Sequence, residues 1–238
     1  MKSYISLVLL GVLSLYAVFG CEGEAQKATT ENTSKAQSLM IDDFEKEQST
    51  RGYQPYMPGD VVLEQEGYGI YHRGKANVRL SRVPVNKTDD KALRIEFGLD
   101  PISWYHRWVS IRRELTAPLD LREYDGLEFN LLVEVPSNTT LRFTLSDVER
   151  LADAKKHGAD EMWWIDVDPD VLKNTKQEWR TIRAPFREFY LSEGFGTRHN
   201  NGKKDLSRIV AFEMNIISAG DQQKKGVILI NSLRAYKD

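Results

Sequence analysis

The feature that most constrains the fold is a recurring alternation of apolar and polar residues in short runs, from about residue 39 to the end of the 238-residue chain. Clusters of Gly, Pro, Asn and Asp separate these runs, and a helical period is nearly absent. Alternation with a period of two is typical of strands whose side chains point by turns to either face of a sheet. The sequence therefore predicts an antiparallel all-β sandwich.

The alternation predicts ten strands: Met40–Phe44, Asn77–Val83, Ala92–Gly98, Trp108–Leu115, Gly126–Val135, Thr140–Ser146, Met162–Val167, Trp179–Pro185, Ile209–Ile217 and Gly226–Tyr236. One or two helical turns are expected only within Asp147–His157 and near Phe186–Tyr190. The segment Gly52–His72, rich in glycine and tyrosine, is expected to form a long loop beside the sheet.

The N-terminus has the layout of a secretory signal, with Lys2 followed by the apolar run Tyr4–Phe19. This run is shorter than the roughly 20 residues that a membrane-spanning helix needs. The sequence Val18-Phe19-Gly20-Cys21 resembles the bacterial lipobox, and this resemblance implies that Cys21 is acylated and becomes the first residue of the mature protein. The alternative is an ordinary signal peptide with a chance cysteine. Cys21 is the only cysteine, so an internal disulfide is excluded.

Three segments are therefore expected: a lipoprotein signal peptide over 1–20, a tether over 21–38 and a β-sandwich over 39–238. The tether is assigned because residues 22–38 are small, polar or charged and cannot bury enough apolar surface to become ordered. Attachment through acyl chains predicts a lipid-anchored protein of the cell envelope. Glu22 follows the cysteine where an Asp would signal retention in the inner membrane of enteric bacteria, which favours the outer membrane or cell surface.

The charge of the chain excludes one class of partner. The formal net charge is −2, and basic residues form no long run. Proteins that bind nucleic acid usually carry a basic face or stripe. Nucleic-acid binding is therefore not expected.

Four segments, in order along the chain, resemble the galactose-binding-domain-like jelly rolls. They are Ile41–Glu45 (IDDFE), Leu119–Phe129 (LDLREYDGLEF), Glu178–Phe186 (EWRTIRAPF) followed by Phe189, and Asp205–Ile209 (DLSRI) with the closing strand Val227–Arg234. The segments are most similar to those of family 11 carbohydrate-binding modules and of the related complex I intermediate-associated protein 30 domains. The resemblance implies a jelly-roll sandwich for nearly all of residues 39–236.

The same resemblance raises the question of a structural calcium ion, with Asp43, Glu45 and Asn231 as the candidate ligands. Many relatives have acidic residues in the closing strand, where this chain has Asn231 and Ser232. An amide oxygen is a weaker ligand for a hard cation than a carboxylate. No other cofactor is expected.

Alternation also predicts which side chains point away from the core, and these form the candidate site. The outward positions combine polar groups with indole rings, and the aromatic loop adds two tyrosines. The glycan-binding candidates are Asn130, Arg142, Thr144, Trp164, Asp166, Glu213, Asn215, Trp108, Tyr68 and Tyr71. Sugar rings stack on aromatic faces, and sugar hydroxyls bond to amides, carboxylates and guanidinium groups. The competing interpretation is that an antiparallel sheet with one wetted face is polar outside by default.

Three functions are compatible with this pattern. The first is non-catalytic binding of a glycan on a sheet face, with a polysaccharide as partner. The second is a structural or assembly protein that binds another envelope protein through the same sandwich, as the intermediate-associated relatives suggest. The third and least favoured is a glycoside hydrolase, because the paired-carboxylate motif of retaining jelly-roll glucanases is missing although acidic residues are numerous.

Overall fold

The protein is described by a computed structural model that covers residues 38–44, 60–72, 74–85, 90–99, 108–149, 160–168, 170–173, 176–192, 201–218 and 224–238. These residues belong to one compact unit, Lys35–Asp238. The expected signal peptide and Cys21 lie outside the described residues, as does all but the last residue of the tether. No helix within the described ranges is both long and apolar enough to cross a membrane.

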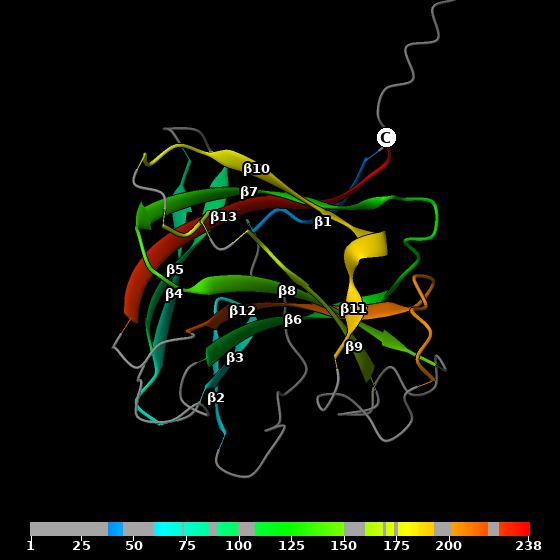
Figure 1. The fold of residues 1–238 in the computed structure, drawn as a ribbon, viewed down its shortest axis with the longest axis horizontal. Helices are drawn as coiled ribbons and strands as arrows, with labels where there is room; N and C mark the ends of the chain where they lie inside the picture. Colours follow the sequence, from blue (N-terminus) through cyan, green and yellow to red (C-terminus); the bar gives the residue numbers. More distant parts are fainter. Residues whose placement is uncertain are drawn as a thin grey trace, which may run out of the picture. The chain divides into compact units, whose positions relative to one another are not determined.

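The described residues form two antiparallel sheets (Figure 1). The first sheet has the order β10-β7-β13-β5-β4, with β1 paired to β13. Its strands are β1 (Ser38–Asp42), β4 (Asn77–Pro84), β5 (Lys91–Leu99), β7 (Gly126–Val135), β10 (Arg180–Pro185) and β13 (Lys224–Tyr236).

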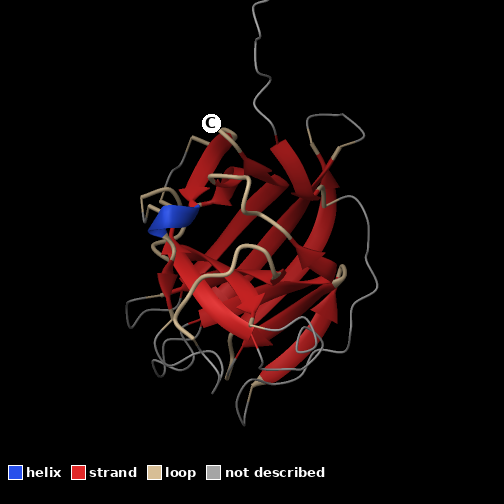
Figure 2. Cartoon of the chain, turned by 90° about the vertical axis from the view of Figure 1, so that its right-hand side faces the viewer, coloured by secondary structure: helices blue, strands red, loops and turns tan. Residues whose placement is uncertain are grey.

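The second sheet has the order β11-β9-β8-β12-β6-β3-β2. Its strands are β2 (Val61–Gln65), β3 (Tyr68–His72), β6 (Trp108–Leu119), β8 (Thr140–Val148), β9 (Asp160–Asp166), β11 (Tyr190–Leu191) and β12 (Ile209–Ile217). One turn of 3-10 helix, η3 (Phe186–Glu188), precedes β11 and is drawn in blue in Figure 2.

The core lies between the inner faces of the two sheets. Phe129 of β7 stacks on Phe143 of β8 with ring centroids 5.3 Å apart, and Phe143 stacks on Phe212 of β12 at 6.0 Å. All three side chains are buried. Stacked aromatic pairs of this kind stabilise a core beyond the area they bury, so this stack joins the first sheet to the second.

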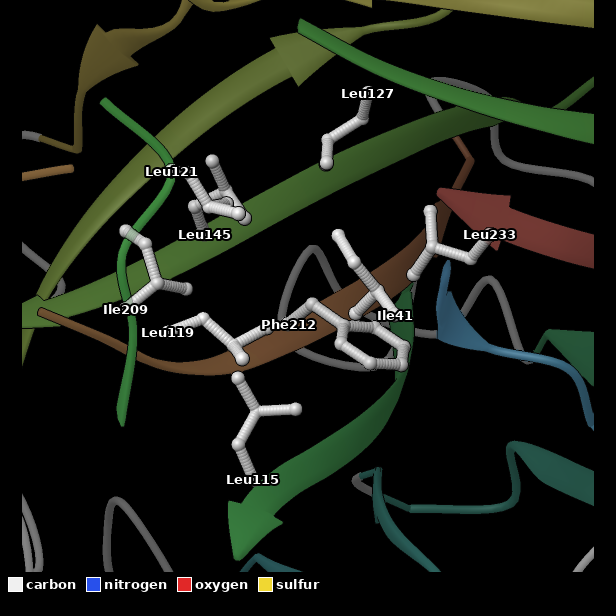
Figure 3. A pocket seen from close by; sticks show the side chains of 9 residues that line it. All are labelled: Ile41, Leu115, Leu119, Leu121, Leu127, Leu145, Ile209, Phe212 and Leu233. Carbon is white, nitrogen blue, oxygen red and sulfur yellow. The ribbon is translucent and has the colours of Figure 1, made fainter. Parts of the chain in front are cut away.

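A small pocket at one end of this core is entirely apolar. Figure 3 shows its side chains converging from both sheets: Ile41, Leu115, Leu119, Leu121, Leu127, Leu145, Ile209, Phe212 and Leu233. Because none of them offers a hydrogen bond, the pocket belongs to the sandwich interior and does not suit a hydrophilic ligand.

The predicted fold class is confirmed, and all ten predicted strands are present. Gly126–Val135 and Ile209–Ile217 have the predicted bounds, and the other strands differ by a few residues at their ends. The predicted helical turns near Phe186 correspond to η3. In contrast, Asp147 and Val148 belong to β8, and residues 150–157 of that predicted segment lie outside the described residues.

The expected loop before His72 was predicted wrongly, because its last part forms the hairpin β2–β3. Its two-residue turn, Glu66-Gly67, has φ angles of 53° and 77°. Positive φ at both turn positions matches the twist of a tight hairpin. Glu is an unusual residue for the first of these positions, so the sequence pattern does not predict the turn.

The Gln65 side chain at the end of β2 covers part of the open edge of β4. Its Oε1 accepts a hydrogen bond from the Leu80 N–H (2.8 Å), and its Nε2 donates to the Val78 carbonyl (3.3 Å). One side-chain amide therefore takes the place of a neighbouring strand at this edge.

A buried polar group ties β1 to the second sheet. Asp42 accepts hydrogen bonds from the Phe44 N–H (2.8 Å) and the Tyr68 hydroxyl (2.7 Å), and Arg113 Nε lies 3.4 Å from it. The Arg113 guanidinium also stands 4.5 Å from the centre of the Tyr68 ring. Burial raises the pKa of Asp42, while Arg113 and these hydrogen bonds oppose the rise.

Gly126, at the start of β7, provides a test of the packing. A Cβ atom there would lie 2.6 Å from the Ala184 carbonyl oxygen and 2.8 Å from Pro185 Cα. Gly126→Ala is expected to lower the free energy of unfolding by about 3 kcal/mol or more, because both close neighbours are backbone atoms and the backbone must move. Gly202→Ala is the control: it has open space around the new Cβ but a φ of +69°, so the expected cost is about 1 kcal/mol. Urea denaturation compares the two, and equal costs would contradict the packing argument.

Candidate functional site

The register of the second sheet brings several predicted residues onto its outer face. Arg142 of β8 lies opposite Asp166 of β9, and Thr144 lies opposite Trp164. On the other side of β8, Asn215 of β12 lies opposite Arg142. Residues of one alternation share a face, which gives this set on the outer face: Arg142, Thr144, Trp164, Asp166, Glu213 and Asn215.

Four partly or fully exposed side chains at one edge of this face form a group that we call the edge cluster: Arg142, Trp164, Asp166 and Tyr190. The Asp166 side chain is 42% exposed and that of Arg142 20%, and Tyr190 is 46% exposed. Trp164 is half-buried. Tyr190 lies on β11, directly opposite Trp164 of β9, at the end of the sheet order.

Direct contacts fix the geometry of the edge cluster. Arg142 donates from Nε and Nη2 to the two carboxylate oxygens of Asp166 (2.6 and 3.0 Å). Its guanidinium stands 4.2 Å from the centre of the Trp164 ring. Trp164 and Tyr190 meet edge to face, with centroids 6.3 Å apart and an interplanar angle of 78°.

The surroundings of Arg142 and Tyr190 raise the pKa of both side chains, so both stay protonated at neutral pH. Burial alone would lower the pKa of Arg142, but the hydrogen bonds and charge of Asp166 raise it. Burial raises the pKa of Tyr190, and Asp166 adds to the rise while Arg142 opposes it. The Tyr190 hydroxyl, 3.4 Å from Asp166 Oδ2, is therefore a hydrogen-bond donor at neutral pH.

The centre of the same face is buried and internally paired. Arg112 of β6 donates from Nη1 to Glu213 Oε1 (2.6 Å) and from Nη2 to Asp160 Oδ2 (2.9 Å). Its Nε donates to Glu114 (2.6 Å), and the Ser110 hydroxyl donates to Glu213 Oε2 (2.7 Å). Buried charges need such partners, so Glu213 lies on the predicted face but is engaged by Arg112 and Ser110.

Two of the predicted site residues do not belong to this face. Asn130 was predicted beside the others, but it lies on β7 of the first sheet and accepts a hydrogen bond from the Thr181 hydroxyl (3.0 Å). Alternation separates inward from outward positions but does not tell which sheet a strand joins. Tyr68 was predicted on an outer loop, but it is a core residue of β3 held by Asp42 and Arg113.

The remaining predicted residues lie on or near the outer face of the second sheet. Thr144 and Tyr71 are buried there, and Asn215 is half-buried and donates to the Thr144 hydroxyl (3.0 Å). Trp108 is half-buried on β6. Two strands, β12 and β8, lie between β6 and β9, so the backbone of Trp108 is about 14 Å along the sheet from that of Trp164.

Tyr190 was not among the predicted residues. It directly follows Phe189, which is buried in the core together with Phe186, the first residue of η3. That segment was expected to turn, and the pairing of Tyr190 with Trp164 depends on a contact between distant parts of the chain. An aromatic residue next to a buried aromatic pair was the only signal available.

The structure describes two of the three candidate calcium ligands. Asp43 is exposed at the end of β1, Asn231 accepts a hydrogen bond from the Ser232 hydroxyl, and Glu45 lies outside the described residues. The neighbouring Asp42 faces the Arg113 guanidinium. Among the described residues, no group of three or more His, Cys, Asp or Glu side chains is arranged to hold a metal ion. With Glu45 outside the described residues, the calcium ligands stay a prediction.

Two acidic residues of β8 and β9 face the inner side of the second sheet, opposite to the face that carries the edge cluster. Asp147 of β8 lies opposite Glu161 of β9, and both are buried. Asp147 Oδ2 accepts the Asp205 N–H, and Glu161 Oε1 accepts the Asn201 N–H. Burial, with repulsion from Glu161, raises the pKa of Asp147 to about 7.

This pKa predicts how stability changes with pH. Between about pH 4 and 7 the folded protein holds a proton that the unfolded chain releases, so the free energy of unfolding falls as pH rises and is level above pH 7. The Asp147 contribution to this fall is at most about 4 kcal/mol. Asp147→Asn keeps a carbonyl acceptor for Asp205 and removes the titration. We expect the variant to be more stable than wild type at pH 8 and its stability to change less across this window.

Urea denaturation at several pH values measures this difference. Asp90→Asn, which removes an exposed carboxylate, is the control and should follow the wild-type profile. An Asp147→Asn profile parallel to that of wild type would contradict the assignment.

Comparison with known proteins places this geometry in a fold. No family model and no curated protein matches the chain. Among solved structures, a family 11 carbohydrate-binding module from Clostridium thermocellum in complex with a beta-1,3-1,4-mixed-linked tetrasaccharide matches with a TM-score of 0.58 and 17% identity, over 84% of this chain and 95% of that one.

Two further solved structures agree. The family 11 module of the cellulosomal cellulase Lic26A-Cel5E of Clostridium thermocellum matches with a TM-score of 0.58 and 15% identity, over 85% of this chain and 95% of that one. The solution structure of CtCBM11 matches with a TM-score of 0.54 and 17% identity, over 87% of this chain and 98% of that one. The expected resemblance is thereby confirmed at the level of fold: the chain is a jelly-roll β-sandwich built like the family 11 carbohydrate-binding modules.

Proposed function

We propose that the protein binds a glycan without catalysis, on the outer face of the second sheet, and that the edge cluster is the centre of this site. The observation that carries the proposal is the joining of two partly exposed aromatic rings to an Arg–Asp pair on adjacent strands. As a lipoprotein, the protein would hold its ligand close to the cell envelope, at the outer membrane or cell surface.

The edge cluster offers both kinds of contact that a sugar requires. The Arg142 guanidinium covers one face of the Trp164 ring, so the C–H face of a pyranose would stack on the exposed Tyr190 ring and on the part of Trp164 that Arg142 leaves uncovered. The Arg142 guanidinium supplies donors, the Asp166 carboxylate supplies acceptors, and the Tyr190 hydroxyl does both. Since Arg142 and Asp166 already hold each other, these side chains would lose little conformational freedom on binding.

The structural neighbours support binding as the function, because the matching modules are named as carbohydrate-binding and one was solved with a mixed-linked tetrasaccharide. The ion pairs favour a non-catalytic role. Asp166 is bound by Arg142 and Glu213 by Arg112, whereas glycoside hydrolysis requires one carboxyl group free to donate a proton.

Binding of another envelope protein is the weaker alternative. A protein interface of this kind favours one contiguous apolar patch. The exposed large aliphatic side chains of the described residues are instead divided among β1, β2 and β7: Met40, Val61, Leu63 and Val135. The aromatic and charged edge cluster is thus better suited to a sugar.

Substitution of the two rings tests the proposal. Trp164→Ala and Tyr190→Ala should each weaken glycan binding about tenfold or more, because loss of a stacked ring removes roughly 1.4 kcal/mol or more of binding free energy. The measurement is affinity electrophoresis in gels containing a panel of soluble polysaccharides, followed by calorimetric titration with the one retained.

Asn130→Ala, on the opposite sheet, is the matched control and should bind like the wild type. The proposal would be wrong if no polysaccharide retards the wild-type protein. It would also be wrong if Asn130→Ala weakens binding while the two ring variants do not.

The anchoring part of the proposal has its own test. Cells grown with an alkyne analogue of palmitate should label the wild-type protein, and Cys21→Ala should abolish the label because no other cysteine is present. The readout is in-gel fluorescence after coupling of a dye. An unlabelled wild type, or a variant labelled as strongly, would contradict acylation at Cys21.

A further inference from the structure

The turn that presents Tyr190 is held by a lysine from a distant part of the chain. Lys204 Nζ donates to the carbonyl of Phe186, where η3 begins, and to that of Phe189 (3.1 Å), just after η3 ends. The same ammonium group stands 5.4 Å from the centre of the Trp163 ring and 5.9 Å from that of Phe189. Tyr190 is the next residue after Phe189, so its backbone leaves the turn that Lys204 closes.

The segment carrying Lys204 is itself fixed to β8 and β9. Glu161 of β9 accepts the Asn201 N–H, and Asp147 of β8 accepts the Asp205 N–H. These bonds hold the backbone on both sides of Lys204. Within the segment, Asn201 Oδ1 accepts the Lys203 N–H (2.7 Å). The carboxylates thus hold the segment, and the segment holds the turn.

The turn before Tyr190 is also held by the buried side chains of Phe186 and Phe189 and by the Phe186 N–H, which donates to the Asp125 carbonyl (2.8 Å). After the turn, Tyr190 has few backbone constraints of its own. β11 is only two residues long and pairs with β9 alone, at the end of the sheet order. One further backbone bond, from the Ser192 N–H to the Met162 carbonyl (2.9 Å), extends this pairing. A short edge strand with one neighbour is held weakly by its own ladder. The position of the Tyr190 ring therefore depends on the anchored turn before it.

We propose that Lys204 is a positioning residue for the edge cluster, and that it sets Tyr190 against Trp164 by tying η3 to the segment held by Asp147 and Glu161. This inference rests on the proposed function for its link to glycan binding. Lys204 is partly buried and points at backbone carbonyls, so it acts through Tyr190 and does not touch the ligand.

The test compares Lys204→Met with Lys203→Met, which removes the same charge from an exposed neighbouring residue. Hydrogen exchange is measured for the amides of Phe189 and Ser192 and for β8 and β12. Lys204→Met should lose protection about tenfold at Phe189 and Ser192 and keep it in β8 and β12, because only the local opening free energy changes. Lys203→Met should match the wild type, and Lys204→Arg should restore part of the protection.

Glycan binding supplies the second readout, with the polysaccharide retained in the affinity gel as the probe. Lys204→Met should weaken binding about fivefold in wild type but add no further loss in Tyr190→Ala, since residues that act through each other are not additive. Additive losses would overturn the proposal, as would unchanged exchange at Phe189 and Ser192, or a uniform loss of protection across the sandwich. A wild type that binds no glycan would overturn the proposed function, and hydrogen exchange alone would then decide the role of Lys204.

Discussion

The contact between the inner faces of the two sheets is the constraint on which the rest of this molecule depends. Phe129 reaches across from the first sheet to Phe143, and Phe143 lies against Phe212 in the second. A strand that commits every second side chain to this contact has only the intervening residues left for the solvent. Arg142, on the strand that carries Phe143, is thereby directed outward, and so is Asn215, on the strand that carries Phe212.

Which of the outward residues remain open to a ligand is decided by ion pairing and position in the sheet. At the centre, Arg112 is buried among Glu114, Asp160 and Glu213 and forms a closed polar group. At the edge, Arg142 and Asp166 are bound to each other but remain partly exposed. Because the centre is paired internally, the partly exposed aromatic and charged side chains lie at the β8–β9–β11 edge, where we place the proposed glycan site.

The sequence was sufficient for the fold class, for most strands and for the outward direction of Trp164 and Asp166, because these follow from local alternation. It was not sufficient for contacts between distant strands. Asn130 has the right alternation but belongs to the other sheet. Glu213 has the right direction but is engaged by Arg112, 101 residues away. Tyr190 pairs with Trp164 of β9, and local alternation does not predict this contact between distant parts of the chain.

The side-chain amide of Gln65 affects how the protein behaves at high concentration. A sheet edge with free N–H and C=O groups is a template on which another chain can add a strand. By occupying the Leu80 N–H and the Val78 carbonyl, Gln65 withdraws that stretch of β4 from intermolecular addition. Concentrated copies of the protein would then be less prone to polymerise through this edge, and a single side chain protects it against fibre growth.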